Sequence, residues 1–413
     1  MSDPVVIVGA GLSGLTAARL LHERGIEVCL FESADDVGGR VRTDLVDGFR
    51  LDRGFQVFLD SYPEAQQMLD YDSLRLRRFE PGSLIVTNAG VRRLVDPWRR
   101  PLGGIRSVFQ GVGSFADKLR IAALRGKVGQ GTPSLLFESH DETSESALRK
   151  MGFSDSMMEQ FLRPFFGGVF LDMDLQTSCR MLYFVFRMFS NGNATLPELG
   201  MGEIGKQLAA SLPEDSIRLG DGLEQLEHHA VRLQSGKVVP YSHVVLALDE
   251  VTASRFLPEL GTQRKPRSVH TLYFAAEQTP SKEKMLTLNG LGRGLINHVC
   301  VPSDVAKSYA PPEQSLISVT VLKAGGEDPA LYQRVQCEAE EWFGKQVKGW
   351  RHLRTDHITR ALPNQSFPAF NPPRHPPHLR DNLYVCGDYR TNGSINGAME
   401  SGRLAAEAIC AAD

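Results

Sequence analysis

The pattern of apolar and polar positions predicts a strand, a helix and a second strand between residues 4 and 32. Residues 4–9 (PVVIVG) form a short, uninterrupted apolar run that ends in glycine, which is typical of a strand buried on both faces. Residues 13–24 repeat apolar side chains at helical spacing, and Gly25 follows as a helix end. Residues 26–32 (IEVCLFE) again read as a strand. We therefore expect a right-handed βαβ unit at the start of the chain.

The rest of the chain predicts a helical middle, further strands, and a closing strand and helix. The expected elements are a mainly helical stretch over 141–200, strands and turns over 217–248, strands at 269–276 and 315–322, an amphipathic helix over 328–347, a strand at 383–386 and a helix from about 397 to 411. Residues 363–382 hold six prolines and are expected to be a surface loop.

Length and charge indicate a two-domain protein and give no support to nucleic-acid binding or to a membrane-spanning helix. The 413 residues exceed the roughly 250–300 at which one hydrophobic core stops growing, so two domains are expected. The net charge of −3 gives no support to nucleic-acid binding. The N-terminus lacks the pattern of a signal peptide, and no apolar run approaches the ~20 residues that span a bilayer.

The six cysteines form no CxxC pair and lie near no histidine at zinc-ligand spacing. Cys29 and Cys386 fall in predicted strands, where we expect them to be buried. A reducing, cytoplasmic compartment follows, without disulfides. The sequence shows no metal cluster, no Ser/His/Asp set and no paired carboxylates, so neither a metal site nor a catalytic residue is assigned.

The first βαβ unit carries a nucleotide-binding pattern. Gly9, Gly11 and Gly14 fit G-x-G-x-x-G between the strand and the helix. Such glycines permit the tight turn, the approach of backbone to a pyrophosphate, and close packing of helix on strand. The helix N-terminus offers free N–H groups to the phosphates. Glu32, at the end of the second strand, is placed to accept hydrogen bonds from ribose hydroxyls.

A second glycine pair favours FAD over NAD. Gly38 and Gly39 are followed by Arg40, whose guanidinium suits a pyrophosphate. The run VVIVGAGLSGLTAARLLHERGIEVCLFESADDVGGRVRTD resembles the FAD fingerprint of the flavin amine oxidase superfamily. That superfamily includes monoamine and polyamine oxidases, protoporphyrinogen oxidase, and the phytoene- and carotene-desaturase-type enzymes.

The C-terminal run NLYVCGDYRTNGSINGAMESGRLAAEAI resembles the second FAD segment of the same superfamily. The resemblance implies that Gly387 and Asp388 approach the ribityl and pyrophosphate region. It also implies that a helix starting near Ser394–Asn396 aims its N-terminus at the flavin pyrimidine edge, where reduced flavin is negatively charged.

The resemblance implies an α/β fold: a discontinuous, Rossmann-like FAD-binding domain of the GR2 type with an α+β substrate-binding domain. We expect residues 1–80, 200–255 and 355–413 in the first domain and residues 81–199 and 256–354 in the second. The predicted cofactor-binding residues are Gly9, Gly11, Leu12, Ser13, Gly14, Glu32, Ser33, Gly38, Gly39, Arg40, Gly54, Phe55, Gln56, Leu223, Gly387, Asp388, Ser394, Ile395 and Asn396.

Two of these assignments rest on position within the family alone. Residues 52–58 (DRGFQVF) stand where relatives run a glycine-containing segment along the flavin ring, so Gly54 would allow close approach and Gln56 would reach the ring. A buried strand-to-turn segment is an equally good interpretation. Leu223 corresponds to a residue that covers the adenine.

The features typical of amine oxidation are incomplete. The strand VHTLYFAA has no lysine near the expected flavin N5, and one aromatic position of the amine-binding pair is Ser394 here. Phe367 or Phe370 would supply the other. The stretch ALPNQSFPAF around these phenylalanines has no cysteine to tether the flavin, so non-covalent FAD is expected.

Two further segments bear on the substrate. Residues 161–189 hold seven phenylalanines, which form either core or a lipophilic pocket over the flavin. Residues 92–127 hold nine Lys/Arg and two acids among large apolar residues. This basic segment is either a solvated face or a peripheral contact with anionic lipid that admits a lipid-soluble substrate.

We therefore predict an FAD-dependent oxidoreductase that takes hydride from a hydrophobic organic substrate, in a desaturation or dehydrogenation. The alternatives are a flavin amine oxidase acting on C–N bonds and a non-catalytic flavin-binding scaffold. The substrate, the electron acceptor and the oligomeric state are not predicted.

Overall fold

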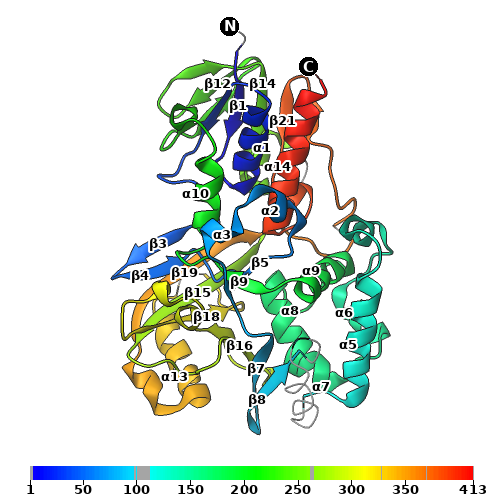
Figure 1. Ribbon diagram of the computed structural model, residues 1–413, viewed down its shortest axis with the longest axis vertical. Helices are drawn as coiled ribbons and strands as arrows, with labels where there is room; N and C mark the ends of the chain where they lie inside the picture. Colours follow the sequence, from blue (N-terminus) through cyan, green and yellow to red (C-terminus); the bar gives the residue numbers. More distant parts are fainter. Residues whose placement is uncertain are drawn as a thin grey trace.

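The computed structural model describes residues 3–96, 99, 112–260, 265–326, 328–368 and 370–412. Figure 1 shows an upper part that carries both chain ends and a wider lower part built from a second sheet and a group of helices.

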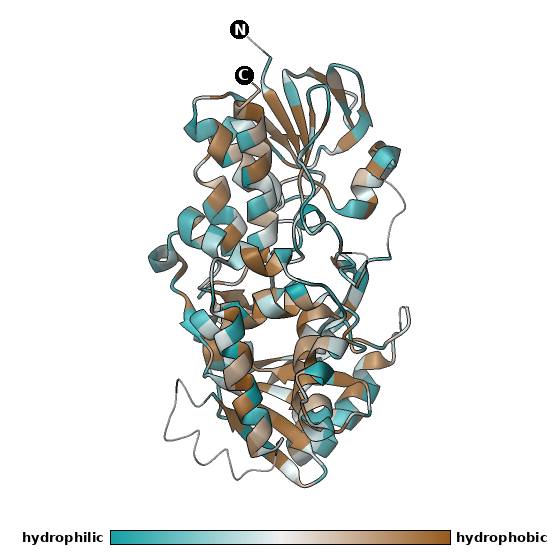
Figure 2. Ribbon diagram, turned by 90° about the vertical axis from the view of Figure 1, so that its right-hand side faces the viewer, coloured by the Kyte–Doolittle hydropathy of each residue, from teal (hydrophilic) through white to brown (hydrophobic). Residues whose placement is uncertain are grey.

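A mostly parallel sheet forms the centre of the upper part, in the order β10-β2-β1-β14-β21-β20. Its strands are β1 (Val5–Val8), β2 (Val28–Phe31), β10 (Ile217–Arg218), β14 (His243–Leu246), β20 (His378–Arg380) and β21 (Leu383–Val385). The predicted βαβ unit is confirmed, because β1 and β2 are parallel and α1 (Leu12–Glu23) connects them. Figure 2 shows the hydrophobic colouring of these strands, as expected when both faces of a sheet are covered.

Two layers cover this sheet. On one face α1 lies beside the C-terminal helix α14 (Ile395–Cys410) (Figure 1). A small sheet packs on the other face. Its strands are β11 (Leu223–Leu226), β12 (Ala230–Leu233) and β13 (Val238–Pro240). Segments from both ends of the chain therefore build one unit.

A seven-stranded sheet dominates the lower part, in the order β19-β15-β18-β17-β16-β7-β8. Its strands are β7 (Gly82–Thr87), β8 (Gly90–Val95), β15 (Arg267–Ala276), β16 (Leu286–Asn289), β17 (Ile296–Cys300), β18 (Ser315–Val321) and β19 (Arg351–Leu362). Helix α13 (Leu331–Phe343) covers the apolar face of this sheet. The predicted strands at 269–276 and 315–322 are thereby confirmed.

Short elements and helices complete the molecule. The remaining strands are β3 (Thr43–Val46), β4 (Phe49–Asp52), β5 (Phe58–Leu59), β6 (Arg77–Arg78) and β9 (Ala194–Leu196). The remaining α-helices of the described residues are α2 (Pro63–Met68), α3 (Tyr71–Leu74), α5 (Phe115–Val128), α6 (Ser144–Lys150), α7 (Asp155–Met157), α8 (Arg163–Phe170), α9 (Cys179–Asn191), α10 (Glu203–Ala209), α11 (Glu250–Phe256) and α12 (Pro302–Val305). The expected helical character of 141–200 is confirmed.

Three expectations need correction. The proline-rich stretch 363–382 is not loop throughout, because β20 within it pairs with β21. The helix expected over 328–347 ends at Phe343, and a 3₁₀ segment follows. Cys29 is half-buried rather than buried, although the other residues of β2 are buried. Cys386 is buried as expected.

The seven phenylalanines of 161–189 belong to one hydrophobic core or pack against it, as the core interpretation expects. In the described ranges no helix combines the length and apolarity needed to cross a bilayer. The same ranges hold no group of three potential metal ligands. Of the basic segment 92–127, residues 97–98 and 100–111 lie outside the described residues.

Candidate functional site

The turn between β1 and α1 packs backbone against backbone. A Cβ on Gly14 would lie 2.0 Å from the carbonyl oxygen of Gly9, so glycine is required for α1 to approach β1. A Cβ on Gly11, in contrast, would meet no atom within 4 Å. Gly11 is the N-cap residue of α1, and no side chain caps the helix. The uncapped N–H groups and the open position at Gly11 suit a phosphate.

Leu12 and Ser13 form the first turn of α1, but their side chains are buried. The Ser13 hydroxyl lies beside the Cys386 thiol, whose pKa burial raises to about 12. Both residues therefore face the turn with backbone N–H groups rather than with side chains.

The second glycine pair lies directly against the first turn. The N–H of Gly38 donates to the carbonyl of Ala10 at 2.8 Å. A Cβ on Gly39 would lie 3.2 Å from the Cα of Gly11. The two glycine-rich segments thus form one continuous backbone surface.

Glu32 closes one end of this surface. Its carboxylate accepts from the N–H of Ala10 at 2.7 Å and from the N–H of Ala34 at 2.9 Å. Ser33 beside it is exposed. Leu223, buried at the start of β11, lies close by, because a Cβ on the preceding Gly222 would be 2.7 Å from the Cβ of Ser33. The structure thus brings Glu32, Ser33 and the Leu223 segment together.

Arg40 and Asp388 meet at the other end. The guanidinium Nη2 lies 2.8 Å from the Asp388 carboxylate, and Nη1 donates to the carbonyl of Ala361 at 3.0 Å. Asp388 follows Gly387, whose N–H donates to the Ser401 hydroxyl at 3.0 Å. The N-terminal and C-terminal segments predicted to hold one cofactor are therefore in direct contact.

The segment Gly54–Gln56 runs from Arg40 to the seven-stranded sheet. The Gln56 amide donates to the carbonyl of Arg40 at 2.8 Å. The Phe55 N–H donates to the Thr271 hydroxyl at 3.4 Å. A Cβ on Gly54 would lie 2.6 Å from the Ile358 side chain. The segment therefore connects the Arg40 region with the seven-stranded sheet. Its close packing is consistent with a segment along the flavin ring and equally with a buried strand-to-turn segment.

The start of α14 departs in part from expectation. Ser394 is the N-cap and accepts from the Gly397 N–H at 2.9 Å, so one of the N-terminal N–H groups is already satisfied. The buried Asn396 side chain accepts from the Glu64 N–H in α2 at 3.0 Å. Ile395 is half-buried against the core. The Asn396 side-chain oxygen is therefore already in use, and the backbone N–H groups at the start of α14 are what this segment offers to a cofactor.

Sequence reasoning missed several residues of this region. Ala10 holds Glu32, and Gly402 lets α14 approach α1, since a Cβ there would be 2.1 Å from the Ser13 carbonyl oxygen. Thr271 and His298 reach the Gly54–Gln56 segment from strands distant in sequence. The small residue at Gly402 was a readable signal, whereas the strand residues needed the register of the sheet.

Comparison with known proteins agrees with this geometry. A family model described as "Flavin containing amine oxidoreductase" matches residues 12–410. Hydroxysqualene dehydroxylase of Rhodopseudomonas palustris is 25% identical over 100% of this chain and 99% of its own length. Protoporphyrinogen oxidase 2 of Arabidopsis thaliana is 32% identical over 40% of this chain, a match that spans only 32% of that relative.

Solved structures show the same fold. Cyclohexylamine oxidase from Brevibacterium oxydans has a TM-score of 0.71 at 16% identity, covering 100% of this chain and 99% of its own. An oxidoreductase from Methanosarcina mazei has a TM-score of 0.72 at 18% identity, covering 98% and 100%. The predicted α/β fold class is confirmed, while the domain boundaries and the contacts of each site residue with a cofactor stay predictions.

Proposed function

The chain belongs to the flavin-containing amine oxidoreductases, and from that premise we propose that it binds FAD non-covalently and removes hydride from a hydrophobic organic substrate. It is a flavin-dependent oxidoreductase, so the interpretation as a non-catalytic scaffold is set aside. When bound, the flavin supplies the two-electron acceptor. The observation that supports FAD most strongly is the joint surface formed by the two glycine-rich segments, Arg40 and Asp388.

The residues fit the parts of this cofactor in order. Glu32 and Ser33 would bind the adenosine ribose, with Leu223 against the adenine. The first turn of α1, from Gly11 to Gly14, would hold the pyrophosphate through backbone N–H groups, and Arg40 would add its charge. Gly387, Asp388 and the backbone at 394–396 would border the ribityl chain and the pyrimidine edge. Gly54–Gln56 would lie along the ring.

Protein groups at this site would position the substrate; the hydride goes to the flavin, and the proton that double-bond formation also releases goes to solvent. The hydrogen-bond partners of the Gly54–Gln56 segment are the Thr271 hydroxyl and the backbone carbonyls of Arg40 and Arg53 rather than an ionised side chain. Removal of hydride from a C–H bond needs alignment and exclusion of water above all. The lower core, rich in phenylalanine, is suited to an apolar substrate.

The desaturase-type reaction is favoured over C–N oxidation. Of the expected aromatic pair, Ser394 caps a helix and Phe370 is buried against Phe137, 6.1 Å between ring centroids. Phe367 is 41% exposed. These positions do not form an aromatic cage for an amine. The relative matched along its full length is named for removal of a hydroxyl group from hydroxysqualene, which does not involve a C–N bond.

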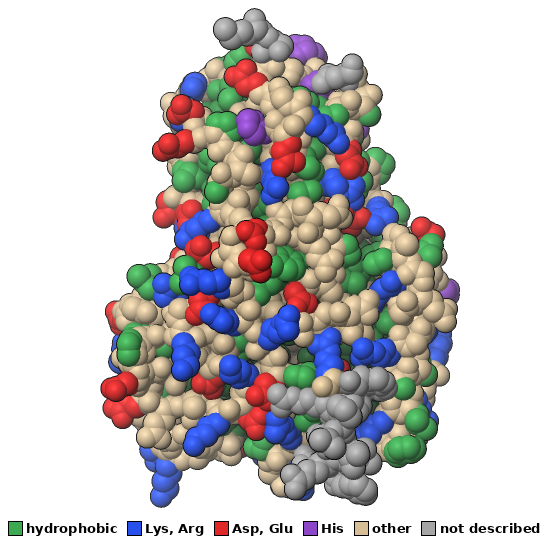
Figure 3. Space-filling view, viewed as in Figure 1, with side chains coloured by type: hydrophobic (Ala, Val, Ile, Leu, Met, Phe, Trp, Pro, Cys, Tyr) green, Lys and Arg blue, Asp and Glu red, His purple; other side chains and the backbone are tan. Residues whose placement is uncertain are grey.

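A peripheral contact with an anionic membrane belongs to the same proposal. In α5, Phe115 and Leu119 are 66% and 57% exposed and lie four residues apart, so they share one helix face. Figure 3 shows many Lys and Arg side chains on the lower part of the molecule. Exposed apolar residues among cations are typical of proteins that rest on lipid.

The test is a spectrum and a mass measurement of the ligand in the purified protein, followed by anaerobic bleaching. Expected are flavin absorption bands, release of FAD on denaturation, and bleaching by an isoprenoid or a porphyrinogen but not by primary amines. A protein that stays colourless after incubation with FAD would contradict the proposal. Bleaching by amines alone would replace the desaturase-type reaction with C–N oxidation.

A further inference from the structure

One face of the seven-stranded sheet carries a row of buried polar side chains. Thr271 of β15 is paired with Thr320 of β18, and Thr320 is paired with His298 of β17. Their exposures are 0%, 2% and 5%. The alternate residues of these strands form the apolar face under α13. Directly opposed residues of antiparallel strands have adjacent side chains, so the three groups form one polar row.

This row borders the segment proposed to lie along the flavin ring. The Phe55 N–H donates to the Thr271 hydroxyl, and the Phe55 ring contacts the His298 ring edge-on, with 5.1 Å between centroids. Gly54 beside it approaches the sheet as closely as only glycine allows. His298 is thus one side chain away from the proposed flavin edge.

The neighbouring Asn297 determines which ring nitrogen of His298 carries hydrogen. The Asn297 Nδ2 lies 3.1 Å from the carbonyl oxygen of Pro164 and 2.9 Å from His298 Nδ1. A carbonyl only accepts, so the atom facing it is the amide NH₂. Nδ1 therefore accepts as well, and in the neutral ring the hydrogen is on Nε2. Burial lowers the pKa of His298 to about 4, which keeps the ring neutral at pH 7.

The Nε2–H of His298 and the Thr320 hydroxyl find no hydrogen-bond partner among the described residues. A buried polar group without a hydrogen-bond partner destabilises the folded protein. Buried groups of this kind are normally paired, and two that lie in register beside a candidate cofactor edge point to a ligand.

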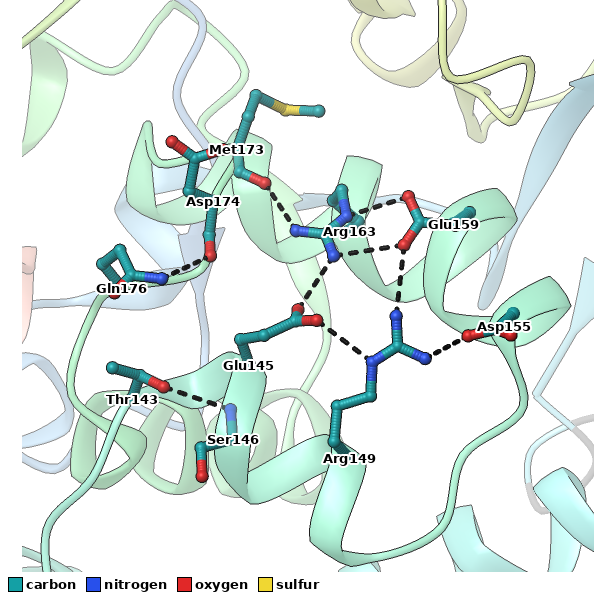
Figure 4. Close-up of polar contacts among 10 residues, drawn as sticks. All are labelled: Thr143, Glu145, Ser146, Arg149, Asp155, Glu159, Arg163, Met173, Asp174 and Gln176. Carbon is teal, nitrogen blue, oxygen red and sulfur yellow. Dashed lines mark hydrogen bonds and ion pairs between the residues drawn. The ribbon is translucent and has the colours of Figure 1, made fainter.

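The arrangement is preformed, because α8 holds Asn297 in place. Arg163 of that helix donates to the Met173 carbonyl and to Glu145 of α6, both at 2.9 Å, and also pairs with Glu159 (Figure 4). Gly168 lets the helix approach, since a Cβ there would be 2.7 Å from the Asn297 amide nitrogen. A donor held this way needs little reorganisation to bind its acceptor.

We propose that His298 Nε2–H and the Thr320 hydroxyl bind an oxygen atom of the substrate, so that the enzyme selects an apolar molecule carrying a carbonyl or hydroxyl group. This inference rests on the proposed function, because it takes Gly54–Gln56 as the edge of the flavin. It makes His298 a specificity-determining residue that contacts substrate.

The test compares two probes of similar shape, acetophenone and ethylbenzene, which differ by one carbonyl oxygen. Their binding to the FAD-loaded protein is followed by the shift of the flavin absorption bands. The wild type is expected to bind acetophenone about tenfold more tightly. His298→Phe should remove the preference for acetophenone. His298→Gln keeps an N–H donor and should retain part of the preference. Thr320→Val should reduce it. FAD retention should be the same in all four proteins.

An FAD-loaded wild type that binds both probes equally, or binds neither, overturns the inference even if the variants do not fold. Loss of FAD in His298→Phe, together with an unchanged probe preference in FAD-loaded Thr320→Val, overturns it too, because the donor would then serve the cofactor. A wild type that holds no FAD fails at the earlier step and contradicts the proposed function instead.

Discussion

The guanidinium of Arg40 and the carboxylate of Asp388 form an ion pair of 2.8 Å, although they come from opposite ends of the chain. Asp388 is almost completely buried, whereas the Arg40 side chain is 37% exposed. The pair therefore joins the two segments and leaves part of the guanidinium open toward the glycine-rich turn. Any cofactor phosphate bound there would share Arg40 with Asp388.

Arg40→Met should weaken FAD binding by about tenfold to a hundredfold, because one charge-assisted contact of about 1.5–3 kcal/mol is lost. The measurement is fluorescence titration of the apoprotein with FAD. Arg380→Met is a matched control, since Arg380 pairs with Glu259 on the surface through β20. Equal FAD affinity in the Arg40 variant and the control would remove Arg40 from the site.

Gly11→Ala and Gly14→Ala should separate binding from folding. A Cβ on Gly11 meets no protein atom, so the fold should keep its Tm while FAD retention falls. A Cβ on Gly14 would collide with the Gly9 carbonyl, so that variant should lose about 3 kcal/mol or more of stability. Thermal unfolding of the apoproteins and flavin absorbance after gel filtration give the two readouts. A Gly11 variant that retains FAD fully would argue against a phosphate at the turn.

Glu32→Arg should release FAD during gel filtration, because a cation would replace the acceptor of the ribose hydroxyls and lose the contact with Ala10 N–H. Glu32→Gln keeps a carbonyl acceptor and should retain more cofactor. If both variants elute with as much flavin as the wild type, Glu32 does not contact the ribose.

Asp52 should make stability depend on pH. Burial raises the pKa of Asp52 to about 6, although its carboxylate accepts from Tyr309 at 2.9 Å and from the Met201 N–H at 3.0 Å. Since the unfolded value is about 3.9, the folded state binds the proton more tightly. The contribution of Asp52 to the free energy of unfolding should therefore fall by about 3 kcal/mol as pH rises from 4 to 6. Above pH 6 this contribution should stay constant.

Urea unfolding of the wild type and Asp52→Asn at pH 4, 5, 6 and 7 isolates this contribution. The free energy of unfolding of the wild type, relative to that of Asp52→Asn, should decrease as pH rises from 4 to 6. A difference that is constant across these pH values would mean that Asp52 titrates with its ordinary pKa.

Phe115→Ser combined with Leu119→Ser should reduce sedimentation with phosphatidylserine vesicles by about tenfold or more, because two apolar side chains would no longer enter the lipid. Leu45→Ser is the control, since Leu45 is 70% exposed but lies on β3, far from α5 in sequence. Wild-type protein that stays in solution with these vesicles would exclude the contact.

Much of the nucleotide-binding unit could be predicted from local pattern. Its elements depend on residues close in sequence: a strand before Gly9, a helix before Gly25 and a second strand before Glu32. Their geometry is therefore encoded locally. The C-terminal strand and helix were found in the same way. The error at 363–382 arose because β20 forms only through its pairing with β21, which no local pattern shows.

The sequence by itself determined that a βαβ unit with this glycine spacing opens the chain and that a matching segment closes it, because turn and helix geometry follow from neighbouring residues. Only the tertiary structure decided that Arg40 meets Asp388, that Asn396 is used by α2, and that His298 and Thr320 stand in one polar row. These relationships depend on sheet register and on contacts between distant segments, where a shift of one residue would turn each side chain to the opposite face.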